Sequence, residues 1–248
     1  MVGREKEINM KQTILLLLII GCSLSLFAQE KPKSTYEKKV NFGIKGGFNA
    51  AMYFVDEFKI KDITINEIQN NYKVGYFGGL FLRVNMKKHF IEPEISYHVS
   101  KCEISFDKMG SQHPDIEPDY ASINSTIHTI EIPVLYGYNF VKDGPYGMAF
   151  FAGPKIKYVW EKKSKLEFTN FDQKGIKEEL YPFNVNVVAG VGVNISNIFF
   201  DFRYEVGLNN ISKSVTYIES NADGSEEVAN MTFKRRSNLL SFSLGVIF

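Results

Sequence analysis

The sequence has few cysteines, almost no net charge and no long apolar run after its first 28 residues. Its two cysteines, Cys22 and Cys102, cannot form a disulfide framework. The 29 Lys and Arg residues against 28 Asp and Glu residues give a net charge of +1, which argues against nucleic acid as a partner. After Ala28 no apolar run approaches the ~18 residues of a spanning helix, so any membrane insertion there must use strands.

Apolar and aromatic residues are plentiful, at 44% and 14% of the chain, which suffices for one large β domain. The first 28 residues read as a secretory signal peptide, because an apolar run follows Met10 and ends near the small residue Ala28. We expect cleavage near Ala28.

Two alternatives stay open in this N-terminal segment. Translation starts at Met1 or at Met10. The stretch Ile19-Ile20-Gly21-Cys22 also resembles a lipoprotein signal, in which Cys22 is lipidated. We rank that second, because apolar residues continue past Cys22, whereas a mature lipoprotein normally begins with a polar tether.

The rest of the chain alternates between long segments of period-two character and connections of two lengths. Every segment reaches the ~9–11 residues that a membrane-spanning strand needs. Tight turns at Met86–Lys88, Val141–Pro145 and Ile195–Asn197 alternate with polar stretches of roughly twenty residues. The eight predicted strands are 40–53, 72–85, 89–101, 124–140, 146–160, 181–194, 198–211 and 231–248.

This alternation of short and long connections is typical of outer-membrane barrels, with short periplasmic turns and long external loops. The sequence therefore predicts an all-β fold, an eight-stranded antiparallel up-and-down transmembrane β-barrel over 40–248. A short periplasmic segment over 29–39 would precede it.

The segment IFFDFRYEVGL at 198–208 places Asp201, Arg203 and Glu205 at every second position. Because successive side chains of a strand point to opposite faces, it has one charged and one apolar wall. In a transmembrane barrel the apolar wall faces lipid and the charged wall faces the lumen.

The same parity assigns charges of both signs to the lumen, five cations and five anions. A barrel of eight strands is just wide enough for side chains to fill it, so this balance predicts a closed ionic network. A solvated face without pairing is the simpler alternative. The predicted lumen charges are Lys45, Arg83, Glu92, Glu94, Glu131, Lys155, Lys157, Asp201, Arg203 and Glu205.

Aromatic residues gather at strand ends on the lipid-facing parity, as two interfacial girdles would require. Tyr136, Tyr138 and Phe140 lie near a turn, whereas Tyr158 and Trp160 lie near a long connection.

Three prolines, Pro93, Pro133 and Pro154, fall inside predicted strands, where each removes a ladder donor. A closed barrel has no free edge for them, so we expect β-bulges at these positions.

Catalytic and metal-binding patterns are weak. Ser125, His128 and Glu131 are close in sequence, but Ser125 and His128 fall on opposite faces. The carboxylates of Glu92 and Glu94 share a face, where salt bridges to Arg83 or Lys155 explain them better than acid/base chemistry. The four histidines do not converge on one site, so we expect no metal site. Taken together, these patterns lead us to expect no enzyme activity and no cofactor.

The succession of motifs resembles one known family. The most specific motifs are Glu131-Ile132-Pro133, Ala152-Gly153-Pro154 and RYEVGLNNIS at 203–212, within a resemblance that covers nearly all of the expected mature chain. They resemble the PorT-like outer-membrane β-barrel family of the Bacteroidetes. The resemblance implies an eight-stranded outer-membrane barrel, places Pro133 and Pro154 where that family carries them, and makes Phe248 a C-terminal signal for the barrel assembly machinery.

We therefore expect an outer-membrane protein of a Gram-negative bacterium that acts as a structural or interaction barrel. Its expected partners are outer-membrane lipid, lipopolysaccharide, the assembly machinery and other envelope proteins at its long loops, of which 102–123 is the most acidic. One alternative is a narrow channel or an accessory barrel of a type IX-like secretion system. Another is a soluble periplasmic barrel that binds lipid inside, with the two faces reversed.

Overall fold

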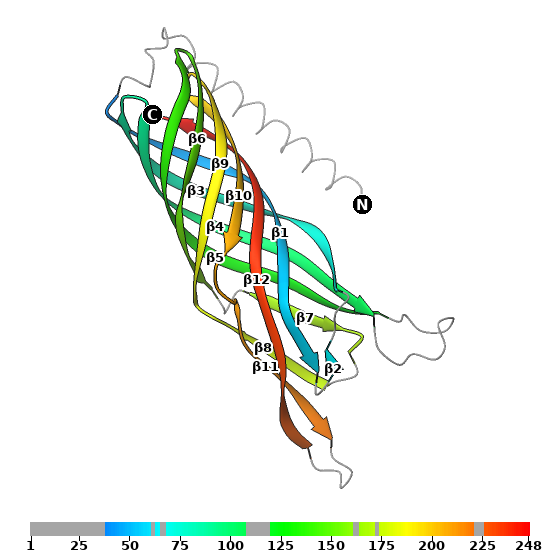
Figure 1. Ribbon diagram of the computed structural model, residues 1–248. Helices are drawn as coiled ribbons and strands as arrows, with labels where there is room; N and C mark the ends of the chain where they lie inside the picture. Colours follow the sequence, from blue (N-terminus) through cyan, green and yellow to red (C-terminus); the bar gives the residue numbers. More distant parts are fainter. Residues whose placement is uncertain are drawn as a thin grey trace, which may run out of the picture. The chain divides into compact units, whose positions relative to one another are not determined.

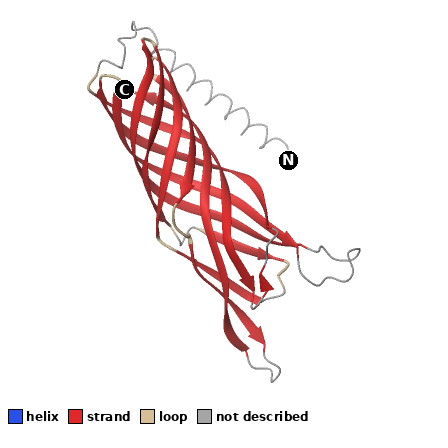
Figure 2. Cartoon of the chain, in the orientation of Figure 1, coloured by secondary structure: helices blue, strands red, loops and turns tan. Residues whose placement is uncertain are grey.

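The computed structural model describes residues 38–60, 63–64, 68–107, 120–160, 164–171, 174–220 and 226–248. These residues form strands, turns and short connections (Figure 2). Within them, no helix has the length and apolar character required of a spanning segment. The predicted signal peptide, the alternative at Cys22 and most of the segment 29–39 lie outside the described residues.

Eight long antiparallel strands form a closed ring, which confirms the predicted barrel (Figure 1). Each strand pairs with the next one in the ring, and pairing between the first and the last closes it. In ring order they are β1 (Val40–Ile60), β3 (Ile68–Met86), β4 (His89–Asp107), β5 (Tyr120–Asp143), β6 (Tyr146–Val159), β9 (Phe183–Ile195), β10 (Ile198–Gly207) and β12 (Glu226–Ile247).

The two ends of the ring differ in their connections. At one end, here called the turn end, two-residue turns join β3 to β4, β5 to β6 and β9 to β10. At the other, the loop end, the long connections carry four further strands, which Figure 1 shows far from the C-terminus. These are β2 (Ile63–Thr64), β7 (Lys165–Thr169), β8 (Lys174–Leu180) and β11 (Ser212–Ser220).

At the loop end β1, β3, β4, β5 and β12 extend beyond their predicted bounds, whereas β10 ends at Gly207, before the predicted 211. We expected polar connections over 54–71 and 102–123, but β1, β3, β4 and β5 continue well into them. There β7 pairs with β5, and β11 pairs with β12 and β8. The extensions form a second zone of sheet, the loop-end collar, made of 51–60, 68–73, 101–107, 120–128, β7, β8, β11 and 226–237.

The expectation of bulges at the three prolines is wrong. The register of β4 with β5 is the same on both sides of Pro93, and that of β5 with β6 is the same on both sides of Pro133 and Pro154. Register shifts occur elsewhere, for example between Val55 and Glu57 of β1. The ring therefore tolerates each missing donor without a change of register, although the ladders have no paired residues between Pro93 and Ser96 or between Pro133 and Tyr136.

Between the collar and the turn end, the two faces of the ring have the predicted orientation. Phe202 is 48% exposed on the outer wall, whereas Arg203 is only 5% exposed inside. This arrangement contradicts the soluble barrel with reversed faces. In the collar the orientation inverts: Tyr53 and Phe58 are buried inside, and Asp56 is exposed outside.

Phenylalanine side chains fill the lumen at the turn end, and each lies opposite a glycine of the neighbouring strand. The pairs are Phe81 with Gly43, Phe90 with Gly137, Phe151 with Gly190 and Phe199 with Gly245. A Cβ atom on any of these glycines would overlap the facing ring. Small residues on the inner wall therefore make room for aromatic side chains, as in aromatic rescue of strand glycines.

Candidate functional site: an ionic layer inside the barrel

All ten predicted lumen charges point into the ring and are at most 7% exposed. Strand parity places them there, because the apolar residues between them occupy the outer wall. They come from β1, β3, β4, β5, β6 and β10, so most of the ring contributes. Their contacts divide them into two groups, each with equal numbers of cations and anions.

The first group centres on Arg203 of β10. Its guanidinium donates two hydrogen bonds to Glu94, at 2.9 and 2.8 Å, and two to Asp201, at 3.0 and 2.7 Å. Lys45 Nζ lies 2.5 Å from Glu94 Oε2, and Arg83 donates to Glu92. Three cations thus meet three carboxylates across β1, β3, β4 and β10.

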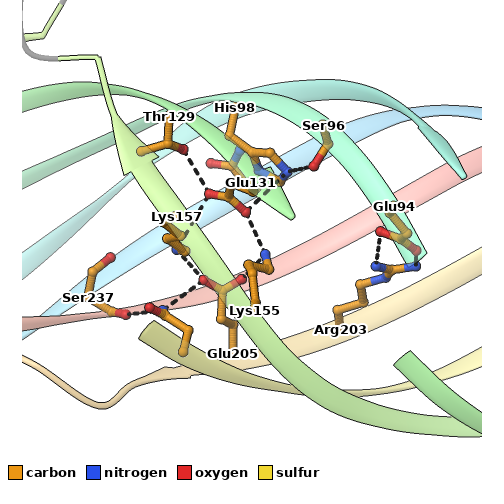
Figure 3. Close-up of polar contacts among 12 residues, drawn as sticks. Glu94, Ser96, His98, Thr129, Glu131, Lys155, Lys157, Arg203, Glu205 and Ser237 are labelled. Atoms are coloured by element: carbon orange, nitrogen blue, oxygen red, sulfur yellow. Dashed lines mark hydrogen bonds and ion pairs between the residues drawn. The ribbon is translucent and has the colours of Figure 1, made fainter. Parts of the chain in front are cut away.

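The second group centres on Lys155 and Lys157 of β6. Figure 3 shows these two lysines between Glu131 and Glu205. Lys155 Nζ lies 2.5 Å from Glu131 Oε2 and also contacts Glu205. Lys157 contacts Glu205 and lies 3.5 Å from Glu131 Oε1. Two cations therefore share two carboxylates. Of the predicted partners of Glu92 and Glu94, Arg83 does pair with Glu92, whereas Lys155 pairs with Glu131 and Glu205 instead.

Uncharged side chains also contact the second group, and the sequence analysis missed their role. Thr129 donates a hydrogen bond of 2.8 Å to Glu131, and Asn186 donates one of 2.9 Å to Glu205. His98 Nε2 lies 3.4 Å from Glu131 Oε2 (Figure 3). The His98 ring also stacks on Phe77, with the ring centroids 4.5 Å apart. Inward parity identified His98, but nothing in the sequence marked these side chains as hydrogen-bond partners.

Apolar side chains lie on both sides of the ionic layer. Toward the turn end are Phe81, Phe90, Phe151, Phe199, Leu135 and Ile247, all buried. The Arg83 guanidinium stacks on Phe90 at 4.5 Å, and that of Arg203 stacks on Phe151 at 4.9 Å. Toward the loop end a larger buried cluster fills the collar, including Tyr53, Phe58, Ile104, Ile123 and Phe233.

The residues considered for catalysis or metal binding do not come together in one site. Ser125 is buried and accepts a hydrogen bond from Arg235, whereas His128 lies on the outer wall, where its Nδ1 is 2.6 Å from the Tyr97 hydroxyl. Among the described residues, no three His, Cys, Asp or Glu side chains are grouped as a metal site would need. His113 lies outside those residues.

The predicted girdle residues are exposed on the outer wall. Tyr136, Tyr138 and Phe140 are near the turn end, and Tyr158 and Trp160 are near the collar. Phe248, at the turn end, stacks on Phe42 with ring centroids 5.2 Å apart.

Comparison with known sequences gives one decisive match. Residues 27–213 match the family described as outer membrane protein beta-barrel domain. The chain belongs to this family. It is therefore an outer-membrane β-barrel protein, located in the outer membrane. No curated protein matches it by sequence.

Solved outer-membrane proteins are similar to this chain at low sequence identity, and OprG is one that shares its fold. The outer membrane protein OprG from Pseudomonas aeruginosa is 12% identical, with a TM-score of 0.52 over 85% of this chain and 97% of OprG. Neisserial surface protein A is 12% identical, with a TM-score of 0.38 over 84% and 99%. A major outer membrane protein from Thermus thermophilus is 9% identical, with a TM-score of 0.42 over 85% and 100%.

Proposed function

We propose that this outer-membrane protein is a structural or interaction barrel with a closed lumen, whose contacts with other envelope components are made at its loop end. The observation that carries the proposal is the filling of the lumen, in which ten buried charges lie together with buried apolar side chains toward both ends, and Arg83 is set among the aromatic rings of the turn end. Transfer of an ion through the lumen would require desolvation and disruption of paired charges, both of which are costly.

The proposal includes finer assignments. The motif resemblance supports membership of the PorT-like branch of the Bacteroidetes, export by the N-terminal signal and recognition of Phe248 by the assembly machinery. Lipid and lipopolysaccharide would surround the exposed apolar wall. No enzyme activity is proposed, because the ionisable groups of the lumen are engaged with one another.

Conductance of the purified, folded protein in planar lipid bilayers tests the closed lumen. We expect insertion without steady ohmic current at moderate voltage. Heat-modifiable mobility on gels provides the control for folding. Reproducible single-channel steps from the parent protein would contradict the proposal and favour the narrow channel. Loss of a secreted cargo on deletion would favour the secretion accessory instead.

A further inference from the structure

Arg235 of β12 is a buried cation in the loop-end collar, separate from the ionic layer. Its side chain is fully buried, and its guanidinium stacks on Tyr53 at 4.3 Å and on Phe233 at 5.0 Å. Nη1 donates a hydrogen bond of 3.1 Å to Ser125 Oγ, but the buried Nε has no hydrogen-bond partner. The strands of the permanent ring thus hold a cation that needs an anion within an apolar setting.

A strand outside the ring supplies that anion. Nη2 of Arg235 lies 3.0 and 2.9 Å from the two carboxylate oxygens of Glu178, whose side chain is also fully buried. Glu178 belongs to β8, and among the described strands β8 has ladder pairing only with β11. β8 is therefore held to the collar by one buried ion pair, an exposed pair between Glu179 and Lys213, one ladder and the packing of apolar side chains such as Leu180.

We infer that Arg235 is a ligand-binding site for a carboxylate with an apolar tail, and that Glu178 occupies this site in the closed state. Displacement of β8 would leave Arg235 buried without an anion, which is strongly unfavourable unless another anion replaces Glu178. An exogenous carboxylate supplies the same two oxygens. Its tail replaces the packing of Leu180 within the buried collar cluster.

This arrangement couples ligand binding to the position of β8. A ligand shifts a two-state equilibrium by its differential affinity, and here the ligand and β8 compete for one guanidinium. Binding thus releases β8, together with the edge of β11, on the external side of the membrane. The inference does not depend on the closed lumen, because the ionic layer takes no part in the replacement of Glu178 by the ligand.

Hydrogen exchange of the full chain in detergent micelles tests the inference, with mass spectrometry of the peptide that covers 174–180. We expect dodecanoate to speed the exchange of this peptide at least severalfold. Dodecanol has the same tail without the charge, and we expect it to have no effect. A peptide from β9 at the turn end serves as the internal reference.

Variants of neighbouring residues provide matched controls. Glu178→Gln should speed exchange of 174–180 about tenfold or more without ligand, because it breaks a buried charge pair. Glu179→Gln changes the next residue, whose exposed side chain pairs with Lys213, and should leave exchange unchanged. Arg235→Gln should abolish the dodecanoate response, whereas Arg236→Gln, which breaks an exposed pair with Asp56, should retain it.

The outcomes separate a binding site from a purely structural ion pair. If Glu178→Gln releases β8 but dodecanoate has no effect on the parent protein, the ligand site is disproved. An equal response to dodecanol, or a response that persists in folded Arg235→Gln, would also overturn it. Heat-modifiable mobility establishes that each variant is folded, and a failed conductance test would leave this result unaffected.

Discussion

The two zones of this barrel share long strands such as β1 and β12 but have opposite amphipathic sense. In the part of the ring between the collar and the turn end, Lys45 of β1 points inward and Phe48 points outward. Further along the same strand, Tyr53 and Phe58 point inward and Asp56 points outward. β12 shows the same inversion.

The difference indicates what surrounds each zone. Apolar side chains face outward where lipid covers the wall, and inward where water covers it. Period-two alternation therefore reports a strand with two unlike faces, but the identity of the inner face depends on the medium outside. On the outer face of β1 the change falls between Phe54, which is still apolar and exposed, and Asp56, and this position estimates where the membrane ends on the loop side.

The largest expected effect comes from a single cation removed from the ionic layer. Lys155→Met leaves Glu131 and Glu205 short of a partner in a buried site. Removal of one partner from a buried pair costs about 3–5 kcal/mol. We expect the free energy of unfolding, measured by urea titration in lipid vesicles, to fall by this amount, or the variant to fail to insert.

A cation of the collar provides the matched control. Lys234 is exposed and pairs with Glu57 at 2.7 Å, so Lys234→Met should lower the free energy of unfolding far less than Lys155→Met does. If the two lysine variants lose equal stability, the buried ionic layer is not the special zone that its geometry indicates.

A smaller effect is expected from a charge placed on the outer wall. Phe202→Arg puts a cation on the lipid-facing side and should cost about 2–4 kcal/mol at the bilayer midplane. Thr232→Arg makes the same addition on the exposed face of β12 in the collar, where water should accept it. Folding yield into vesicles, followed by heat-modifiable mobility, measures both variants. If Phe202→Arg inserts as well as the parent protein, the assignment of the lipid-facing and lumen-facing walls is reversed.

Much of the ring was predictable because lipid imposes one rule on it. Strand number, tight turns and the inward parity of residues such as Arg203 follow from alternation and from connection length. The collar was not predictable in the same way. Its strands continue the same period into segments whose many polar residues suggested loops, and the inversion removes the apolar outer face that marked a strand.

The contacts inside the lumen were also only partly predictable. Parity placed Lys155 inside, but its choice of Glu131 and Glu205 depends on strand stagger, which sequence spacing does not give. Arg235 and Glu178 were missed altogether. They lie far apart in sequence, and Glu178 comes from β8, a strand in a segment expected to be a loop.

The smallest expected effect is the acid titration of Glu57 in the collar. Hydrogen bonds from Lys234 and Lys59, at 2.7 and 2.8 Å, together with their charges, lower the pKa of Glu57 from 4.5 to about 2. Because the folded pKa lies below the unfolded one, this stabilisation is complete above about pH 4.5 and is lost as the pH falls toward 2.

Glu57→Gln should therefore lower Tm slightly at neutral pH, and the difference from the parent should vanish as the pH approaches 2. High salt should also reduce it, because the pair is exposed. Thermal melts of both proteins across this range provide the measurement. A difference that persists at pH 2 would mean that Glu57 acts through packing rather than charge.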